Sequence, residues 1–148
     1  MDNIIQREYY SGKKRKHTIK YEIGIQLQTG NIVWLAGGVP GSVHDLTLLR
    51  SCNLLSKLFY GEFILADKAY IGETCLLHPI KPASTIEEKE FNATISSIHE
   101  TVEHTIQRIK IFGFTQQKWR HNLNLHPIAF KVICHTLNIE FLFNPVHK

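Results

Sequence analysis

A run of four uncharged, mostly bulky residues, 63–66, ends abruptly at Asp67 and is followed by Lys68, Ala69 and Tyr70. The run is too short for a helix of its own and predicts a β-strand that is buried on both faces. In α/β proteins such a strand delivers the residue at its C-terminal end to the edge of the sheet, where these proteins keep their sites. Asp67 is therefore a candidate site residue, although an aspartate is also common in a plain turn.

Two further strands are predicted before this run. Residues 17–28 alternate between apolar and polar side chains, as in a half-buried strand. Its apolar face would carry Ile19, Tyr21, Ile23, Ile25 and Leu27. A turn with Gly30 and an apolar run over residues 32–36 complete a predicted hairpin. The glycines and the proline of residues 37–41 predict the end of the sheet.

Ser42 stands three residues before Asp45, which is the spacing of a capping box with Asp in place of the usual Glu. A helix of about four turns is predicted to follow, because leucines recur at helical spacing after Asp45. A carboxylate in the first turn interacts favourably with the helix dipole. Asp45 therefore has a structural explanation that competes with a catalytic one.

A long helix is predicted from Thr85 to about Phe112, since no Pro or Gly interrupts this stretch and Thr85 forms a capping-box pair with Glu88. Its core-facing stripe would carry Ile95, Ile98, Val102, Ile106 and Ile109. Glu103 lies at the margin of that stripe and shares its side with His99 and Lys110, although ordinary surface pairs have the same spacing.

A last helix is predicted to start with Pro127 at its first position. Its buried side would carry Phe130, Ile133, Cys134, Leu137 and Phe141. Between the two helices, Trp119 stands between Lys118 and Arg120. An aromatic between two cations suits contact with nucleic acid, whereas a Trp that anchors a loop to the core is the more common arrangement.

A chain of 148 residues with 43% hydrophobic content predicts a single domain over residues 1–148. We expect a soluble protein, because there is no signal-peptide pattern and no apolar run of membrane-spanning length. The three cysteines, Cys52, Cys75 and Cys134, are far apart in apolar surroundings, which indicates core residues in a reducing compartment.

The net charge is +4, and its distribution indicates an anionic partner. A basic run follows Gly12 and consists of Lys13, Lys14, Arg15 and Lys16. Such a run suits phosphate contacts, while a solvated strand entrance or a nuclear import signal would use the same residues.

Several chemistries are excluded by spacing. His99 and His104 are five residues apart, whereas both zinc-protease helix motifs require a closer spacing. No nucleophile elbow, P-loop or dinucleotide fingerprint occurs. What remains is a set of carboxylates with cations nearby, and hard oxygen ligands select Mg²⁺ or Mn²⁺. Two such ions can activate water and stabilise the leaving oxygen of a phosphodiester, so metal-dependent phosphoryl transfer on nucleic acid is the predicted class.

Four stretches, in order, resemble DDE transposases of bacterial insertion sequences and the related Harbinger-derived nucleases. They are residues 9–20, 38–45, 66–70 and 102–110. The resemblance implies an RNase H-like mixed sheet flanked by helices, in which two aspartates and one glutamate bind two Mg²⁺ ions and cut double-stranded DNA at transposon ends. It also implies a homodimer, located in the bacterial cytoplasm or, in a eukaryotic host, in the nucleus.

Carried over to this chain, the resemblance makes Asp67 and Glu103 catalytic metal ligands, with 35 residues between them. The family signature of Tyr, Arg, Glu and Lys falls on Ser96, His99, Glu103 and Lys110, so only the last two match.

Asp2 is the only upstream candidate for the first aspartate, which leads us to expect a short or missing first strand. Asp45 is a possible ancillary metal ligand. The expected DNA contacts are Lys13, Lys14, Arg15, Lys16, Lys68, His99 and Lys110. The competing hypothesis is a truncated, catalytically inactive remnant that only binds DNA or a full-length partner.

Overall fold

The computed structural model describes residues 9–11, 16–67, 70 and 72–146. The chain forms two compact units: Met1–Glu22 with Ala36–His78, and Ile23–Leu35 with Pro79–Lys148. Each unit is held together by its own internal contacts. The organisation of residues 1–148 as one domain stays a prediction.

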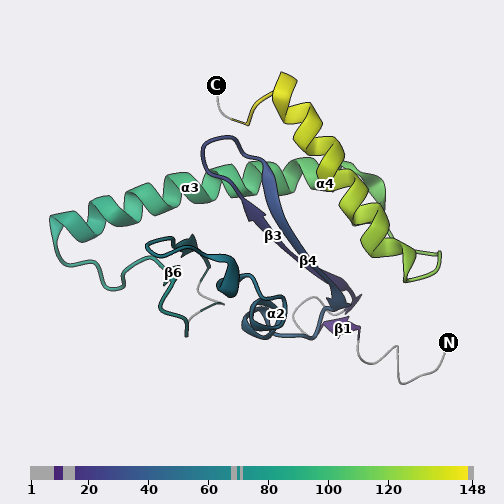
Figure 1. The fold of residues 1–148 in the computed structure, drawn as a ribbon, viewed down its shortest axis with the longest axis horizontal. Coiled ribbons are helices and arrows are strands. Elements are labelled where there is room, and N and C mark those ends of the chain that lie inside the picture. Colours follow the sequence, from purple (N-terminus) through teal and green to yellow (C-terminus); the bar gives the residue numbers. More distant parts are fainter. Residues whose placement is uncertain (1–8, 12–15, 68–69, 71, 147–148) are drawn as a thin grey trace. The chain divides into compact units, whose positions relative to one another are not determined.

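The class is mixed α/β, as predicted, with three two-stranded sheets among the described residues (Figure 1). Strand β1 (Tyr10–Ser11) pairs antiparallel with β2 (Lys16–His17). Strand β3 (Ile19–Ile25) pairs with β4 (Ile32–Pro40), and β5 (Ile64–Leu65) pairs parallel with β6 (Leu76–Leu77). Within the described ranges, no helix combines the length and hydropathy that a membrane span requires.

The predicted hairpin of β3 and β4 is confirmed, but β4 does not end where the glycines begin. It continues to Pro40, because Gly37 and Gly38 adopt φ values of +120° and +80° that side-chain-bearing residues rarely reach. A Cβ added at Gly37 would lie only 2.5 Å from the carbonyl oxygen of Lys20. The glycines therefore permit a close approach of two strands instead of ending the sheet.

The predicted faces of β3 are wrong in one respect. Glu22, placed on the polar face by the alternation, is only 8% exposed, whereas Leu27 lies beyond the strand and is 39% exposed. Alternation describes a strand with one face in water, and the middle of β3 does not meet that condition. Glu22 is thus a buried carboxylate.

Helix α2 (Asp45–Ser51) has two turns instead of the four predicted. It ends because Asn53, just past the C-cap Cys52, has a left-handed φ of +57°, a conformation that commonly terminates helices. Beyond it, Leu55 begins a short 3-10 helix, η1 (Leu55–Lys57), and Leu54 and Leu58 flank it. The core of the first unit joins Leu49, Ala66 and Leu76.

Strand β5 is the predicted strand over residues 63–66, shortened to two residues. Its register pairs Ile64 with Leu76 and Leu65 with Leu77. The prediction of burial on both faces is wrong for Phe63, which is 57% exposed, because it precedes the paired residues. Ala66 at the other end is buried, and Asp67 follows it directly.

The long helix α3 (Ile86–Ile111) and its capping box are confirmed. The hydroxyl of Thr85 accepts a hydrogen bond from the Glu88 N–H at 3.2 Å, and a Glu88 carboxylate oxygen accepts from the Thr85 N–H at 3.0 Å. The buried face is shifted from the predicted stripe, since Thr101 and Thr105 are 5% and 0% exposed. Threonines are small enough to allow close packing there.

Helix α4 (Leu125–Phe143) starts two residues before the predicted Pro127 and packs against α3 (Figure 1). Its predicted buried side is confirmed in full. The amide of Asn138 donates to the Ile32 carbonyl at 2.9 Å and accepts from the Ile32 N–H at 2.8 Å. Arg108 of α3 and Glu140 of α4 form an ion pair at 2.6 Å. These contacts join both helices and β4 within the second unit.

Four rings form an aromatic knot, which we define as Phe114, Trp119, His121 and His126, between α3 and α4. Trp119 meets the rings of His126, His121 and Phe114 at centroid distances of 4.9, 5.1 and 5.6 Å, within the range of favourable aromatic pairs. His126 is buried. Of the two interpretations of Trp119, the structure confirms the loop anchor.

Burial lowers the pKa of His126 below its usual value. The unfolded chain therefore binds a proton at this residue more readily than the folded chain below about pH 6.5. We expect the free energy of unfolding to fall as the pH is lowered from 7 toward 5, measured by urea titration. The variant His126→Phe should lose part of this slope, whereas His135→Gln, on the exposed side of α4, should keep it. A slope unchanged in both variants would contradict the assignment.

Candidate functional site

Asp67 stands at the C-terminal end of β5 with its side chain exposed, as the sequence predicts. Its carbonyl accepts a hydrogen bond from the Tyr70 N–H at 3.0 Å. The preceding residue, Ala66, donates its N–H to the Leu77 carbonyl at 3.1 Å, and the Nδ1 of His78 lies 3.2 Å from the Ala66 carbonyl oxygen. Backbone contacts thus hold Ala66, the residue before Asp67, while the Asp67 carboxylate is accessible.

The half-buried side chain of Tyr70 has a pKa that depends on the charges around it. Its pKa is raised, first by burial and then by the negative charges of Glu22, Asp45 and Asp67. These carboxylates come from three elements, β3, α2 and the end of β5, and all belong to the first unit. Because Tyr70 keeps its proton, its hydroxyl is a neutral hydrogen-bond donor beside a concentration of negative charge.

Glu22 is a member of this group that the sequence analysis did not identify. The thiol of Cys52 donates to Oε1 of Glu22 at 3.4 Å, and the pKa of that thiol is raised by burial and, less strongly, by Glu22. A proton therefore stays on the sulfur. The sequence gives no signal that Glu22 is buried, because Lys20 lies on the same predicted polar face and follows the same alternation.

Asp45 has a charged partner within the first unit. Its Oδ1 lies 2.9 Å from Nζ of Lys20, and the same ammonium group donates to the carbonyl of Val43. Asp45 is the first residue of α2, where a negative charge is favourable. The predicted capping box with Ser42 as the N-cap is wrong, because His44 is the N-cap and its side chain makes no capping hydrogen bond.

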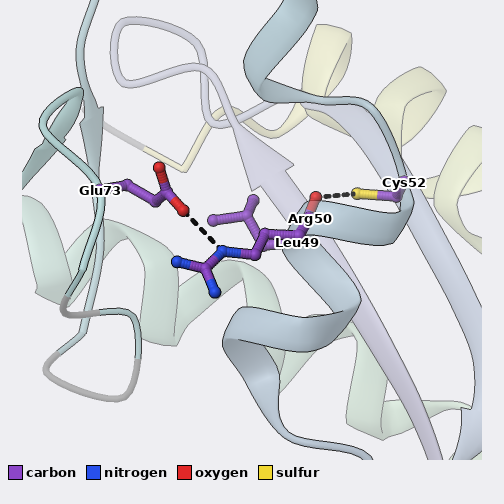
Figure 2. A network of polar contacts seen from close by, with 4 residues as sticks. All are labelled: Leu49, Arg50, Cys52 and Glu73. Carbon is purple, nitrogen blue, oxygen red and sulfur yellow. Dashed lines mark hydrogen bonds and ion pairs between the residues drawn. The ribbon is translucent and has the colours of Figure 1, made fainter.

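Figure 2 shows one contact that joins α2 to another segment and one at the C-terminal end of α2. The guanidinium of Arg50 pairs with the carboxylate of Glu73 at 2.7 Å, and the Leu49 carbonyl oxygen, 3.1 Å from Sγ of Cys52, is a second acceptor that shares the single thiol hydrogen with Glu22. Glu73 lies between β5 and β6, so the ion pair links the helix that carries Asp45 to the segment that follows Asp67.

Glu103 lies in the second unit, on α3, with its side chain exposed. Lys110, seven residues later, is also exposed, and His99 is half-buried. Two helical turns separate Glu103 from Lys110, about 10 Å along the axis. The helix thus presents an accessible carboxylate and an accessible ammonium group.

Of the remaining predicted site residues, only Lys16 is among the described ones, and it is exposed in β2. The others lie outside the described residues: Asp2, Lys13, Lys14, Arg15 and Lys68. Across the part of the chain that is described, no three His, Cys, Asp or Glu side chains are grouped closely enough to hold a metal ion. The donor chemistry of the accessible carboxylates suits a hard cation, but this set of described residues is not a complete site.

The sequence matches the family of DDE superfamily endonucleases over residues 2–138. The chain belongs to this family. It is 28% identical over 144 residues to the protein named as the probable transposase of insertion sequence element IS702 in Microchaete diplosiphon. The HARBI1 proteins of Mus musculus and Rattus norvegicus, which carry the name of a nuclease, are each 24% identical over 104 residues.

The alignments with these relatives cover most of this chain but a smaller share of each relative. The alignment with the IS702 protein covers 91% of this chain and 51% of that protein. The alignments with the HARBI1 proteins cover 68% of this chain and 30% of theirs. The chain thus spans about half the length, or less, of the curated relatives it matches. No solved structure matches it significantly.

Proposed function

We propose that this chain is the catalytic core of a transposase, which cleaves and transfers DNA strands at transposon ends in a metal-dependent reaction on an RNase H-like sheet. The observation that carries the proposal is the accessible carboxylate of Asp67 at the end of β5, in a chain that belongs to the DDE endonuclease family over residues 2–138. Strand ends of this kind are where α/β enzymes hold their catalytic groups.

Asp67 and Glu103 are the proposed metal ligands, and Asp2 is the proposed third. Two bound Mg²⁺ or Mn²⁺ ions would supply an activated water and charge stabilisation at the leaving oxygen. Asp45 is the proposed ancillary ligand, but its ion pair with Lys20 favours the structural role. Tyr70, kept protonated by its surroundings, can donate a hydrogen bond to a phosphate oxygen without adding charge.

The proposed substrate is double-stranded DNA at the transposon ends and at the target. Its phosphates would be bound by the cations along the chain: Lys13, Lys14, Arg15, Lys16, Lys68, His99 and Lys110. Such contacts give affinity without reading sequence. A homodimer, in the bacterial cytoplasm or in the nucleus of a eukaryotic host, completes the proposal, and light scattering with and without DNA would give the oligomeric state.

The test is nicking of a plasmid that carries terminal inverted repeats, with Mg²⁺, with Mn²⁺ and with EDTA. We expect nicks with either ion and none with EDTA, because the described carboxylates can balance phosphate charge only through a cation. Binding of the plasmid without nicking under all three conditions would overturn the proposal and leave a DNA-binding remnant.

A further inference from the structure

The stretch from His104 to Ile139 contains five Lys or Arg residues and no Asp or Glu. It therefore carries more positive charge than the net +4 of the entire chain. Arg108 is engaged within the fold, since it pairs with Glu140 and lies 5.5 Å from the ring centroid of Phe141. The other four cations are exposed and form no ion pair within the described ranges. They are Lys110, Lys118, Arg120 and Lys131.

Two of these cations lie on a loop whose shape is fixed. We define the basic loop as residues 116–124. The indole N–H of Trp119 donates to the Asn122 carbonyl at 3.0 Å, and the Asn122 side chain accepts from the Asn124 N–H at 2.9 Å. At the other end, the Gln116 amide donates to the Lys110 carbonyl at 2.6 Å, which ties the loop to the last turn of α3.

Packing within the aromatic knot holds one side chain of the basic loop, that of Trp119, against neighbouring rings. Trp119 is half-buried against Phe114, His121 and His126, whereas Lys118 and Arg120 on either side of it are exposed. Trp119 already packs against three neighbouring rings, so it serves the loop's own structure, in contrast to the exposed aromatics that stack on the bases of a single strand. Contact through the cations with a phosphate backbone is the chemistry that remains.

We propose that the basic loop is a preformed, sequence-independent contact for the phosphate backbone of duplex DNA, made by Lys118 and Arg120 on a loop that is tied to the last turn of α3. A loop already held in shape loses little entropy on binding. Exposed amides such as Gln117 add neutral donors of the kind that bind phosphate oxygens. This inference rests on the proposed function in one respect, that DNA is the ligand.

The experiment measures the dissociation constant for a 30-base-pair duplex of arbitrary sequence over a range of KCl concentrations, in EDTA so that no strand is cut. The double variant Lys118→Ala/Arg120→Ala should bind more weakly, and the slope of log affinity against log salt should decrease in magnitude by about 1.8, or roughly 0.9 for each lost phosphate contact. The matched control is Lys81→Ala/Lys89→Ala, which removes the same charge from two exposed positions of the second unit.

A slope change in the loop variant alone supports the proposal. Equal slopes for the parent and the loop variant, or equal changes in both double variants, overturn it, as does a loop effect seen with duplex RNA but not with DNA. If the parent binds duplex DNA and the loop variant matches it, only this inference fails. If the parent binds no DNA, the proposed function fails as well.

Discussion

Asp67→Asn is expected to reduce Mg²⁺-dependent nicking by about a thousandfold, equivalent to roughly 4 kcal/mol of transition-state stabilisation. The amide has the shape of the carboxylate but lacks the charge that a divalent ion requires. Since the side chain is exposed, the folded structure should be retained. Initial nicking rates on plasmid DNA, together with circular dichroism, provide the measurement.

Asp45→Asn makes the same chemical change in the same unit and tests the ancillary role proposed for Asp45 against the structural one. It removes the ion pair with Lys20 and the charge at the start of α2, which should cost up to about 1 kcal/mol of stability. Because the ion pair with Lys20 favours the structural role, we expect nicking to stay within about tenfold of the parent, which corresponds to roughly 1.4 kcal/mol of transition-state stabilisation. A larger loss would support the ancillary role. A reversed order, with Asp45→Asn inactive and Asp67→Asn active, would refute the assignment.

Leu137→Ala is expected to lower the free energy of unfolding by about 2–5 kcal/mol, because it opens a cavity where the side chain is only 1% exposed. The thermal midpoint should fall by roughly 5–15 °C, as measured by calorimetry. Leu137 lies on the side of α4 that also buries Ile133 and Phe141.

Leu142→Ala tests whether burial, and not the loss of a leucine from α4, causes this effect. Leu142 lies on the same helix but is 74% exposed, so its change should remain within about 0.5 kcal/mol. Comparable losses in the two variants would show that the outward side of α4 is covered in solution.

Local rules predicted part of this fold well. The capping box of Thr85 and Glu88 and the buried side of α4 depend on residues within one or two helical turns, and both are confirmed. The early end of α2 is also a local effect, and Asn53 was a readable signal for it. Only the leucines beyond Asn53 favoured the longer helix.

Tertiary contacts account for the remaining differences. The continuation of β4 through Gly37 depends on a close approach to Lys20, and the burial of Thr105 depends on what packs against α3. Neither follows from spacing along the chain. At the site, the position of Asp67 at a strand end is confirmed, but the burial of Glu22 was missed for the same reason. The pairing of Asp67 with Glu103 joins two units and stays a prediction.

The shortness of β5 has a consequence for the acid that follows it. In the part of the chain that the structure describes, β5 pairs with β6 over two residues, and Ile64 and Ala66 donate backbone hydrogen bonds to the carbonyls of Cys75 and Leu77. Segments with so few hydrogen bonds open transiently at a free energy well below that of global unfolding. A cation that binds Asp67 only while β5 is paired with β6 would stabilise the paired state by mass action. Cation binding would therefore reduce local unfolding of this strand end.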